Sequence, residues 1–380
     1  MIYYKVIQLI HILFILVISC LGVKGESSLS RVCYLTPQNL PPRKVNSSLC
    51  THIIAGFGSV RDGVIYLGTD ADKKVFRETT DLKSKNPNLK VLLTIGGGGN
   101  DGGFSYAFNS TLNRTRFIIT TLVTLYKYNF DGLDIDWEFP VWNDNTKEDK
   151  ENFANFLKEY ATIAKFYAEA IGKNRSLLSV AVAAPQNIVD SSYDVPQMAK
   201  YVDFINLMSY DFHDFFWYTP FTGHNSPLFN RTTEKAYFAT LNTAWAAAYW
   251  HQLGMPKSKI MVGIPTYGHS YTLVNPDING VDAPAVASFG DVTFPQVCTY
   301  LSNGAHRVFD NESLVPYLYS GYDWISYEDT TSIYGKAKWI ISEGYGGAMT
   351  YNLNSDDWSS VCDKEPFVLH RTLYNVFNGL

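Results

Sequence analysis

The stretch Phe130-Asp131-Gly132-Leu133-Asp134-Ile135-Asp136-Trp137-Glu138-Phe139-Pro140 places four carboxylates within eight residues. The last three, Asp134, Asp136 and Glu138, alternate with apolar residues, which predicts a β-strand that carries all three on one face. Like charges aligned in this way are unfavourable unless protons, hydrogen bonds or a substrate offset them. We therefore expect one carboxyl group with a raised pKa, which its neighbours keep protonated and able to act as a general acid near neutral pH.

A solvated acidic edge strand is the alternative interpretation of this stretch. The apolar residues around the carboxylates argue against it, because they favour burial of the segment. These residues are Phe130, Trp137, Phe139 and Pro140. For Asp131, at the start of the strand, we expect a structural role rather than proton donation.

The composition of the 380-residue chain indicates a globular protein, because hydrophobic residues reach 46% and charged residues only 18%. This length allows one large α/β domain or two ordinary ones. The net charge is −5 and no basic cluster occurs, so we expect no nucleic-acid partner. Aromatic residues reach 15%, and their rings can serve core packing or stack on sugar faces.

The first 25 residues are typical of a secretory signal peptide. Lys5 precedes an apolar run over residues 6–23, and the small residues Gly22 and Gly25 follow near a cleavage site. A signal anchor is the alternative, since the run is just long enough to span a membrane. In either case the remaining chain faces the lumen or the exterior, and after cleavage we expect a secreted, extracellular protein without a membrane segment.

Cysteine usage agrees with an oxidising compartment. Outside the leader, which holds Cys20, the chain has Cys33, Cys50, Cys298 and Cys362, an even number that permits three disulfide connectivities. Six Asn-x-Ser/Thr sequons suit a glycoprotein, and they begin at Asn46, Asn109, Asn113, Asn174, Asn230 and Asn311. No spacing of Cys and His resembles a zinc site, and we expect neither a metal nor a cofactor.

Short β-like runs alternate with longer helical patterns along the chain. Eight strands are predicted, at residues 31–35, 52–58, 90–95, 132–138, 178–183, 204–208, 259–264 and 346–351. Helices are predicted at 115–128, 152–171 and 235–253, and Thr146 with Asp149 predicts a capping box before the second of these. The pattern predicts a (β/α)8 TIM barrel, in which Glu138 lies at the C-terminal end of a strand, where barrel active sites form.

A doubly wound sheet is the rival fold, but the glycine-rich run at residues 96–99 lacks the Lys-Ser/Thr of a phosphate loop. Residues 270–323 interrupt the alternation with several turns and a short strand, which predicts a small α+β insertion between strands seven and eight. No linker or repeated module follows Cys362, so we expect no separate C-terminal binding domain.

The opening stretch fits Asp-x-x-Asp-x-Asp-x-Glu and resembles the signature of the family-18 glycoside hydrolases, the chitinases and chitinase-like lectins. The resemblance extends from Val32 to about Leu380. Further segments similar to the family's strands are Val32-Cys33-Tyr34, Cys50-Thr51-His52-Ile53-Ile54-Ala55-Gly56-Phe57, Leu92-Leu93-Thr94-Ile95-Gly96-Gly97, Val202-Asp203-Phe204-Ile205-Asn206-Leu207-Met208-Ser209-Tyr210-Asp211-Phe212-His213, Thr222-Gly223-His224-Asn225-Ser226-Pro227-Leu228 and Val262-Gly263-Ile264-Pro265-Thr266-Tyr267-Gly268. The resemblance implies disulfides Cys33–Cys50 and Cys298–Cys362, and an insertion that walls one side of a substrate cleft.

The resemblance also implies a substrate-assisted mechanism, in which the substrate's own acetamido group attacks the anomeric carbon. Glu138 would be the acid. Asp136 would bond first to Glu138 and then to the acetamido N–H, while Asp134 would share a proton with Asp136. Tyr210 would donate its hydroxyl to the acetamido oxygen. The remaining residues expected to bind sugar are Tyr34, Phe57, Gly97, Met208, Asp211, Tyr267, Tyr351 and Trp217.

Several positions depart from the family pattern. Gly98 and Gln38 stand where the family usually has Trp, which removes two stacking platforms. Tyr351 stands where the floor of the cleavage subsite is usually Trp, and His269 where Arg is usual. The cluster Phe215-Phe216-Trp217-Tyr218 offers aglycon-side stacking, or equally an aromatic loop packed on the insertion. For His213 and His224 we expect structural roles.

The resemblance implies a secreted, monomeric endochitinase that hydrolyses β-1,4-linked N-acetylglucosamine polymers, with chitin or N-acetylglucosamine oligosaccharides as its partners. A chitinase-like lectin with weak or no activity is the alternative, although such lectins typically lose the acidic Glu that this chain keeps as Glu138. Hydrolysis of a related short glycan or glycoprotein core is a third possibility.

Overall fold

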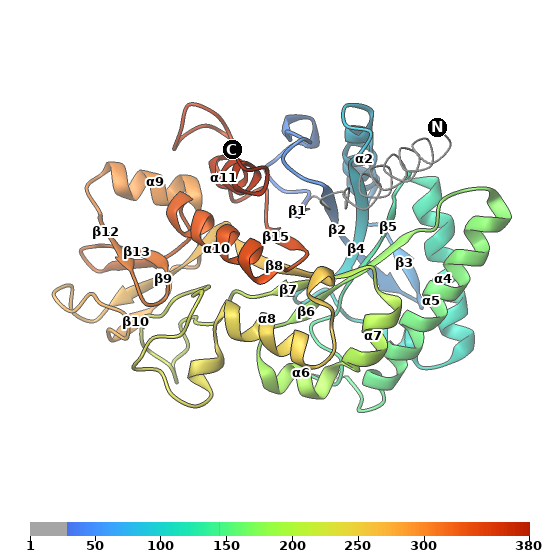
Figure 1. Cartoon of the computed structure of the whole chain (residues 1–380), viewed down its shortest axis with the longest axis horizontal. Coiled ribbons are helices and arrows are strands. Elements are labelled where there is room, and N and C mark those ends of the chain that lie inside the picture. The colour runs from blue at the N-terminus through green and yellow to red at the C-terminus, as the bar shows by residue number, and fades with distance from the viewer. Residues whose placement is uncertain (1–28, 144) are drawn as a thin grey trace, which may run out of the picture.

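Eight parallel strands close into a barrel in the computed structural model, which describes residues 29–143 and 145–380 (Figure 1). The signal peptide expected at residues 1–25 lies outside the described residues. β1 pairs with both β15 and β2, which closes the ring. The barrel strands are β1 (Ser30–Leu35), β2 (His52–Arg61), β4 (Lys90–Gly96), β5 (Gly132–Asp136), β6 (Leu177–Ala183), β7 (Phe204–Met208), β8 (Ile260–Pro265) and β15 (Gly347–Tyr351).

The predicted (β/α)8 fold is therefore confirmed, with small differences at strand ends. β2 runs on to Arg61 because it pairs antiparallel with β3 (Val64–Tyr66). β5 ends at Asp136, so Glu138 follows the strand instead of closing it. The strands are buried on both faces, as expected where helices cover a parallel sheet. A small apolar cluster inside the barrel includes Tyr34 and Met349.

Helices surround the barrel and bury their apolar faces against it. They are α2 (Asp70–Thr80), α3 (Phe104–Phe108), α4 (Thr111–Lys127), α5 (Asp149–Ile171), α6 (Gln186–Ser192), α7 (Val195–Tyr201), α8 (Thr243–Gln252), α10 (Thr330–Glu343) and α11 (Val368–Phe377). In the part of the chain that the structure describes, none of the helices is both long and apolar enough to cross a membrane.

All three predicted helix starts differ from the structure. α4 begins at Thr111 and not at residue 115, because the Ser110 side chain accepts a hydrogen bond from the N–H of Asn113 and caps the helix there. α8 begins at Thr243 and not at residue 235, because the Asn242 side chain accepts a hydrogen bond from the N–H of Trp245 and caps the helix there. At α5 only half of the expected capping box forms, since Asp149 accepts from the Thr146 N–H at 2.7 Å while the helix itself begins at Asp149.

The segment of the chain between β8 and β15 forms a second, antiparallel sheet, which stands beside the barrel (Figure 1). Its strands are β9 (Tyr267–Leu273), β10 (Ala285–Ala287), β11 (Asp291–Thr293), β12 (His306–Asp310), β13 (Val315–Ser320) and β14 (Asp323–Ser326), and α9 (Phe294–Ser302) packs with them. The sheet thus extends three residues beyond each end of the predicted interval 270–323.

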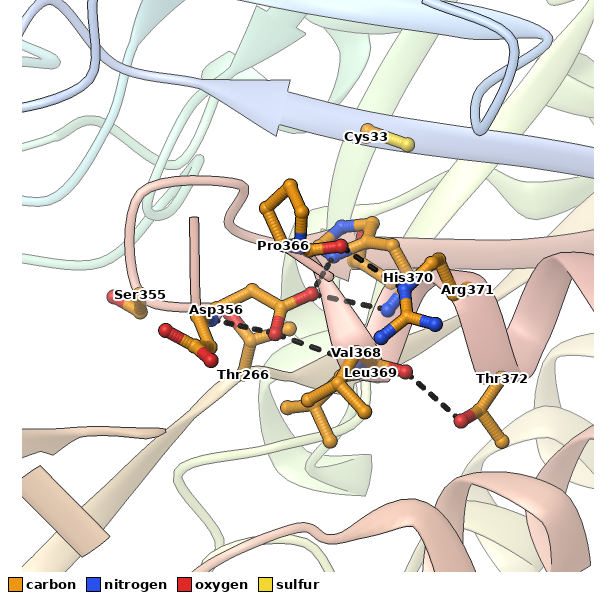
Figure 2. Close-up of polar contacts among 12 residues, drawn as sticks. Cys33, Thr266, Ser355, Asp356, Pro366, Val368, Leu369, His370, Arg371 and Thr372 are labelled. Atoms are coloured by element: carbon orange, nitrogen blue, oxygen red, sulfur yellow. Dashed lines mark hydrogen bonds and ion pairs between the residues drawn. The ribbon is translucent and has the colours of Figure 1, made fainter. Parts of the chain in front are cut away.

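Two disulfides and a buried carboxylate fasten the chain termini of the barrel. The expected pairs Cys33–Cys50 and Cys298–Cys362 are both formed, and the second ties α9 to the segment before α11. Asp356 accepts hydrogen bonds from the N–H groups of Leu369 and His370 and from the His370 ring at 2.6 Å (Figure 2). A distant carboxylate therefore supplies the N-terminal cap of α11.

Candidate active site

A cavity of about 270 Å³ opens at the C-terminal ends of the barrel strands. Ten of the residues predicted from the sequence line this cavity, together with Gly98, and an eleventh, Asp134, is buried behind Asp136. The lining residues are Tyr34, Phe57, Gly97, Gly98, Asp136, Glu138, Met208, Tyr210, Asp211, Tyr267 and Tyr351. Parallel strands bring their C-terminal ends together, which is why residues on or just beyond seven of the barrel strands meet here.

Glu138 lies just beyond the end of β5, and its carboxyl group faces this cavity. Burial raises the pKa of Glu138 to about 7, and the negative charges of Asp101 and Asp211 add to the shift. A hydrogen bond from the backbone N–H of Gly98 acts in the opposite direction. A carboxyl group with this pKa is protonated in about half of the molecules at neutral pH and can readily release the proton, as a general acid must.

Asp136 and Asp134 lie on the same face of β5, as predicted, at successively greater depth. Asp134 is fully buried and accepts hydrogen bonds from Tyr34 Oη at 2.7 Å, Ser179 Oγ at 2.6 Å and Asn206 Nδ2 at 3.1 Å. Burial raises the pKa of Asp134, and these hydrogen bonds oppose the shift. Both carboxyl oxygens of Asp134 are thereby engaged, and the side chain is held in one position.

The carboxylate of Asp136 has fewer partners. Burial raises its pKa well above the ordinary value, and the charges of Glu138 and Asp134 raise it further. Its Oδ1 atom is buried without a hydrogen-bond partner among the described residues. No hydrogen bond between Asp136 and Glu138 occurs among those of the described residues, and such a bond needs a proton on one of the two carboxyl groups. Asp136 thus keeps an acceptor free.

Aromatic rings form the walls and floor of the cavity. The Tyr351 ring lies 5.6 Å from that of Tyr34 and 6.2 Å from that of Tyr210, centroid to centroid. The Tyr210 hydroxyl contacts only the Met349 sulfur, at 4.0 Å, among the described residues. A thioether is a weak acceptor, so this hydroxyl is available to a bound molecule.

Asp211 and His269 form an ion pair at the rim. His269 Nε2 lies 2.9 Å from Asp211 Oδ1, and His269 Nδ1 lies 2.7 Å from the carbonyl oxygen of His213. Both ring nitrogens face acceptors, so the ring needs both protons. Burial lowers the pKa of His269, but the bond and charge of Asp211 outweigh this and raise it to about 9. Tyr267 Oη also donates to Asp211 Oδ1 at 2.5 Å.

A second cleft of about 500 Å³ continues from the cavity and shares Asp211, Tyr267 and Tyr351 with it. Trp217, which was expected to bind sugar, lines neither space and is 84% exposed, so any contact that it makes with a sugar lies outside these two clefts. A β-bridge between Phe216 and Thr219 closes a tight turn with Trp217 at its tip. Of the cluster Phe215-Phe216-Trp217-Tyr218, Phe216 is the member that lines the second cleft.

Sequence reasoning missed several contributors to this site. The sequence indicated only that Gly98 replaces a tryptophan of the family pattern. In the structure its backbone N–H donates to the Glu138 carboxylate and lowers the pKa of that group. Ser179 and Asn206 hold Asp134 from β6 and β7, and their inward position on those strands was the available signal. His224, expected to be structural, pairs with Asp310 at 3.0 Å and is buried.

Comparison with known proteins places this geometry in a family. Residues 30–356 match the sequence profile of Glycosyl hydrolases family 18. Chitotriosidase-1 of Mus musculus is 36% identical, over 95% of this chain and 81% of its own length. The immunomodulatory active chitinase TsES1 of Trichuris suis superposes with a TM-score of 0.86 and 33% identity, over 92% of this chain and 99% of its own.

Human YKL-39, described as a pseudo-chitinase with retained chitooligosaccharide binding properties, superposes with a TM-score of 0.85 and 30% identity, over 92% of this chain and 100% of its own. The neighbours therefore include an active chitinase and a protein that binds oligosaccharides without that activity. With the family profile matching most of its length and the carboxylates of β5 meeting at the mouth of a barrel, this chain belongs to glycosyl hydrolase family 18.

Proposed function

We propose that the protein is a secreted chitinase that hydrolyses β-1,4 bonds of N-acetylglucosamine polymers with retention of configuration. The observation that carries this proposal is the arrangement of three groups around one cavity. Glu138 has a pKa of about 7, Asp136 keeps a free buried acceptor, and Tyr210 keeps a free hydroxyl. These are the acid, the anion and the donor that substrate assistance requires.

In the first step Glu138 gives its proton to the glycosidic oxygen while the bond from that oxygen to the anomeric carbon breaks. The acetamido carbonyl oxygen of the same sugar forms a new bond to the anomeric carbon and yields an oxazolinium ion. Asp136 accepts the acetamido N–H and stabilises the positive charge, and Tyr210 directs the carbonyl oxygen.

In the second step a water molecule attacks the anomeric carbon from the side that the leaving group vacated. The Glu138 carboxylate takes a proton from this water, and the bond to the acetamido oxygen breaks. Two inversions at one carbon give net retention, and Glu138 regains its proton. Asp134 keeps β5 and Asp136 in place through its bonds to Tyr34, Ser179 and Asn206.

Oligosaccharide binding with little catalysis is the second candidate. One argument for it is Tyr351, whose ring offers less stacking area at the floor of the cavity than the Trp of the family pattern. Another is the pair Gly97 and Gly98, which has no side chain to stack on a sugar at this rim. Binding alone would not need a protonated Glu138, and this favours the enzyme.

The deciding experiment is product analysis of purified protein with N-acetylglucosamine tetramer and, in parallel, a high-mannose glycopeptide. A chitinase releases dimer and monomer from the tetramer, with the β-anomer formed first. Binding of the tetramer without product would identify the lectin, and cleavage of the glycopeptide alone would identify a glycoprotein-directed hydrolase. For the protein itself we propose secretion after removal of residues 1–25, N-glycosylation and a monomeric state.

A further inference from the structure

A large cleft lies far from the catalytic cavity. It measures about 930 Å³ and lies at the N-terminal ends of the barrel strands, since it is lined by residues near the starts of β1, β2 and β4. Arg31, His52 and Lys90 come from these strand starts, and Tyr374 comes from α11. Parallel strands place these ends on the face of the barrel opposite the catalytic cavity.

Arg31 is the centre of this cleft. Its side chain is only 8% exposed, and its Nε donates to the carbonyl oxygen of Leu49 at 2.8 Å. Its guanidinium carbon lies 5.0 Å from the centre of the Tyr374 ring. The four N–H groups on its terminal nitrogens have no acceptor among residues 29–143 and 145–380. A buried guanidinium with an unused fork of donors is suited to a planar or tetrahedral oxyanion.

The charge around Arg31 has one sign. Lys85 and Lys90 line the same cleft, and in the described part of the chain neither forms an ion pair. No Asp or Glu occurs among the described lining residues. The carboxylates whose charges reach His52 are already engaged, Asp131 by Lys83 at 3.0 Å and Asp203 by Arg175 at 2.5 Å. This local excess of three cations contrasts with the net charge of −5.

The walls of the cleft are fixed before any ligand binds. The Cys33–Cys50 disulfide holds the segment that carries Asn46 and Ser47, and Asn86 Nδ2 donates to the Ser47 carbonyl at 3.0 Å. On the other side, Asp356 pins the start of α11, which carries Tyr374 (Figure 2). Preformed donors lose little conformational entropy when they bind an anion.

We propose that this cleft at the base of the barrel is an oxyanion-binding site for a sulfate or phosphate group, in which Arg31 makes the direct contact and Lys85 and Lys90 supply the surrounding charge. The group is either a free ion or one carried on a sugar chain. Nothing in the catalytic chemistry uses these residues, so the site acts independently of Glu138.

The test is titration of the whole protein with sodium sulfate and with sodium phosphate by calorimetry, with sodium chloride holding the ionic strength constant. We expect one saturable site with a dissociation constant of about 1 mM or lower. The double variant Lys85→Ala/Lys90→Ala and the single variant Arg31→Gln should each weaken binding about tenfold or more. Lys165→Ala, which removes an exposed lysine on α5, should leave it unchanged.

A second arm separates the two sources of the anion by comparing a sulfated tetrasaccharide with its desulfated form. Tighter binding of the sulfated form than of inorganic sulfate supports a group carried on a sugar chain, and equal binding supports a free ion. Arg31 packs on Tyr374. If Arg31→Gln loses its fold, the lysine double variant decides the question, since Lys85 is exposed and Lys90 is half-buried. The proposal is overturned if none of the probes saturates, or if the lysine double variant binds as tightly as the wild type.

Discussion

Replacing His269 by Gln and replacing Asp211 by Asn should move the basic limb of the pH–activity profile in opposite directions. The acid works only when protonated, so activity declines as the pH rises through the Glu138 pKa of about 7. The negative charge of Asp211 contributes to this raised pKa. The imidazolium of His269, 2.9 Å from Asp211, partly neutralises that charge.

The size of the effect follows from the cavity. Asp211 and Glu138 line the same space of about 270 Å³. For the size of the effect we take a charge separation of about 6.5 Å, on the order expected of neighbouring groups that line one small cavity. At that separation, with an effective dielectric constant of about 40 for a half-exposed partner, one charge contributes about 1.3 kcal/mol, or about one pKa unit. Asp211→Asn should therefore lower the apparent pKa by about one unit. His269→Gln should raise it by about half a unit, because the imidazolium lies farther from Glu138.

The assay is kcat/KM for a fluorogenic chitobioside measured between pH 4 and pH 10, which reports the ionisation of the free enzyme. Asp277→Asn and His306→Gln are matched controls, since both residues are exposed and lie outside the two clefts. Shifts of both variants in the same direction, or no shift in either, would refute the electrostatic coupling argued here.

Three other changes test separate parts of the structure. Tyr351→Trp should lower KM about three- to tenfold by enlarging the stacking floor, and an unchanged or higher KM in steady-state assays would show that the sugar does not stack there. Asp356→Ala should lower the free energy of unfolding by about 3–5 kcal/mol and the Tm by about 5 °C in calorimetry. The reason is that the N-terminus of α11 and the His370 ring lose a buried hydrogen-bond partner. Asp363→Ala, at an exposed residue, should change the Tm little. The pKa of His269 is about 9 in the folded protein and 6.5 in the unfolded chain, so the protonated ring stabilises the fold. Its contribution to the free energy of unfolding is about 1–2 kcal/mol, discounted for the exposure of Asp211. This contribution is complete below pH 6.5 and is lost as the pH rises through 9. Denaturant unfolding of the wild type and His269→Gln should therefore converge above pH 9, and a constant difference would contradict the ion pair.

The barrel was predictable because its strands leave a strong local signal. Runs such as Leu177–Ala183 are apolar at every position but Ser179, which is typical of a parallel sheet covered on both faces. The alternation of Asp134, Asp136 and Glu138 likewise predicted one shared face, because side-chain direction in a strand follows from the backbone alone. These features depend on neighbours in the sequence.

The remaining features depend on contacts that sequence spacing does not reveal. The start of α8 is set by the Asn242 cap, and the exposure of Trp217 by a turn of four residues. The ion pair of His269 joins residues 58 positions apart along the chain. The cleft at the base of the barrel joins β1 to the end of the chain through Arg31 and Tyr374, which is why no basic cluster is visible in the sequence.

The central claim is that Glu138 is the proton donor of a hydrolase, and Glu138→Gln tests it most directly. The amide keeps the shape of the carboxyl group but cannot transfer its proton. The measurement combines product analysis on N-acetylglucosamine tetramer with calorimetric binding of the same oligosaccharide. We predict that the variant binds the tetramer within a fewfold of the wild type and releases product at least about a thousandfold more slowly. Equal turnover by the two proteins would contradict the account.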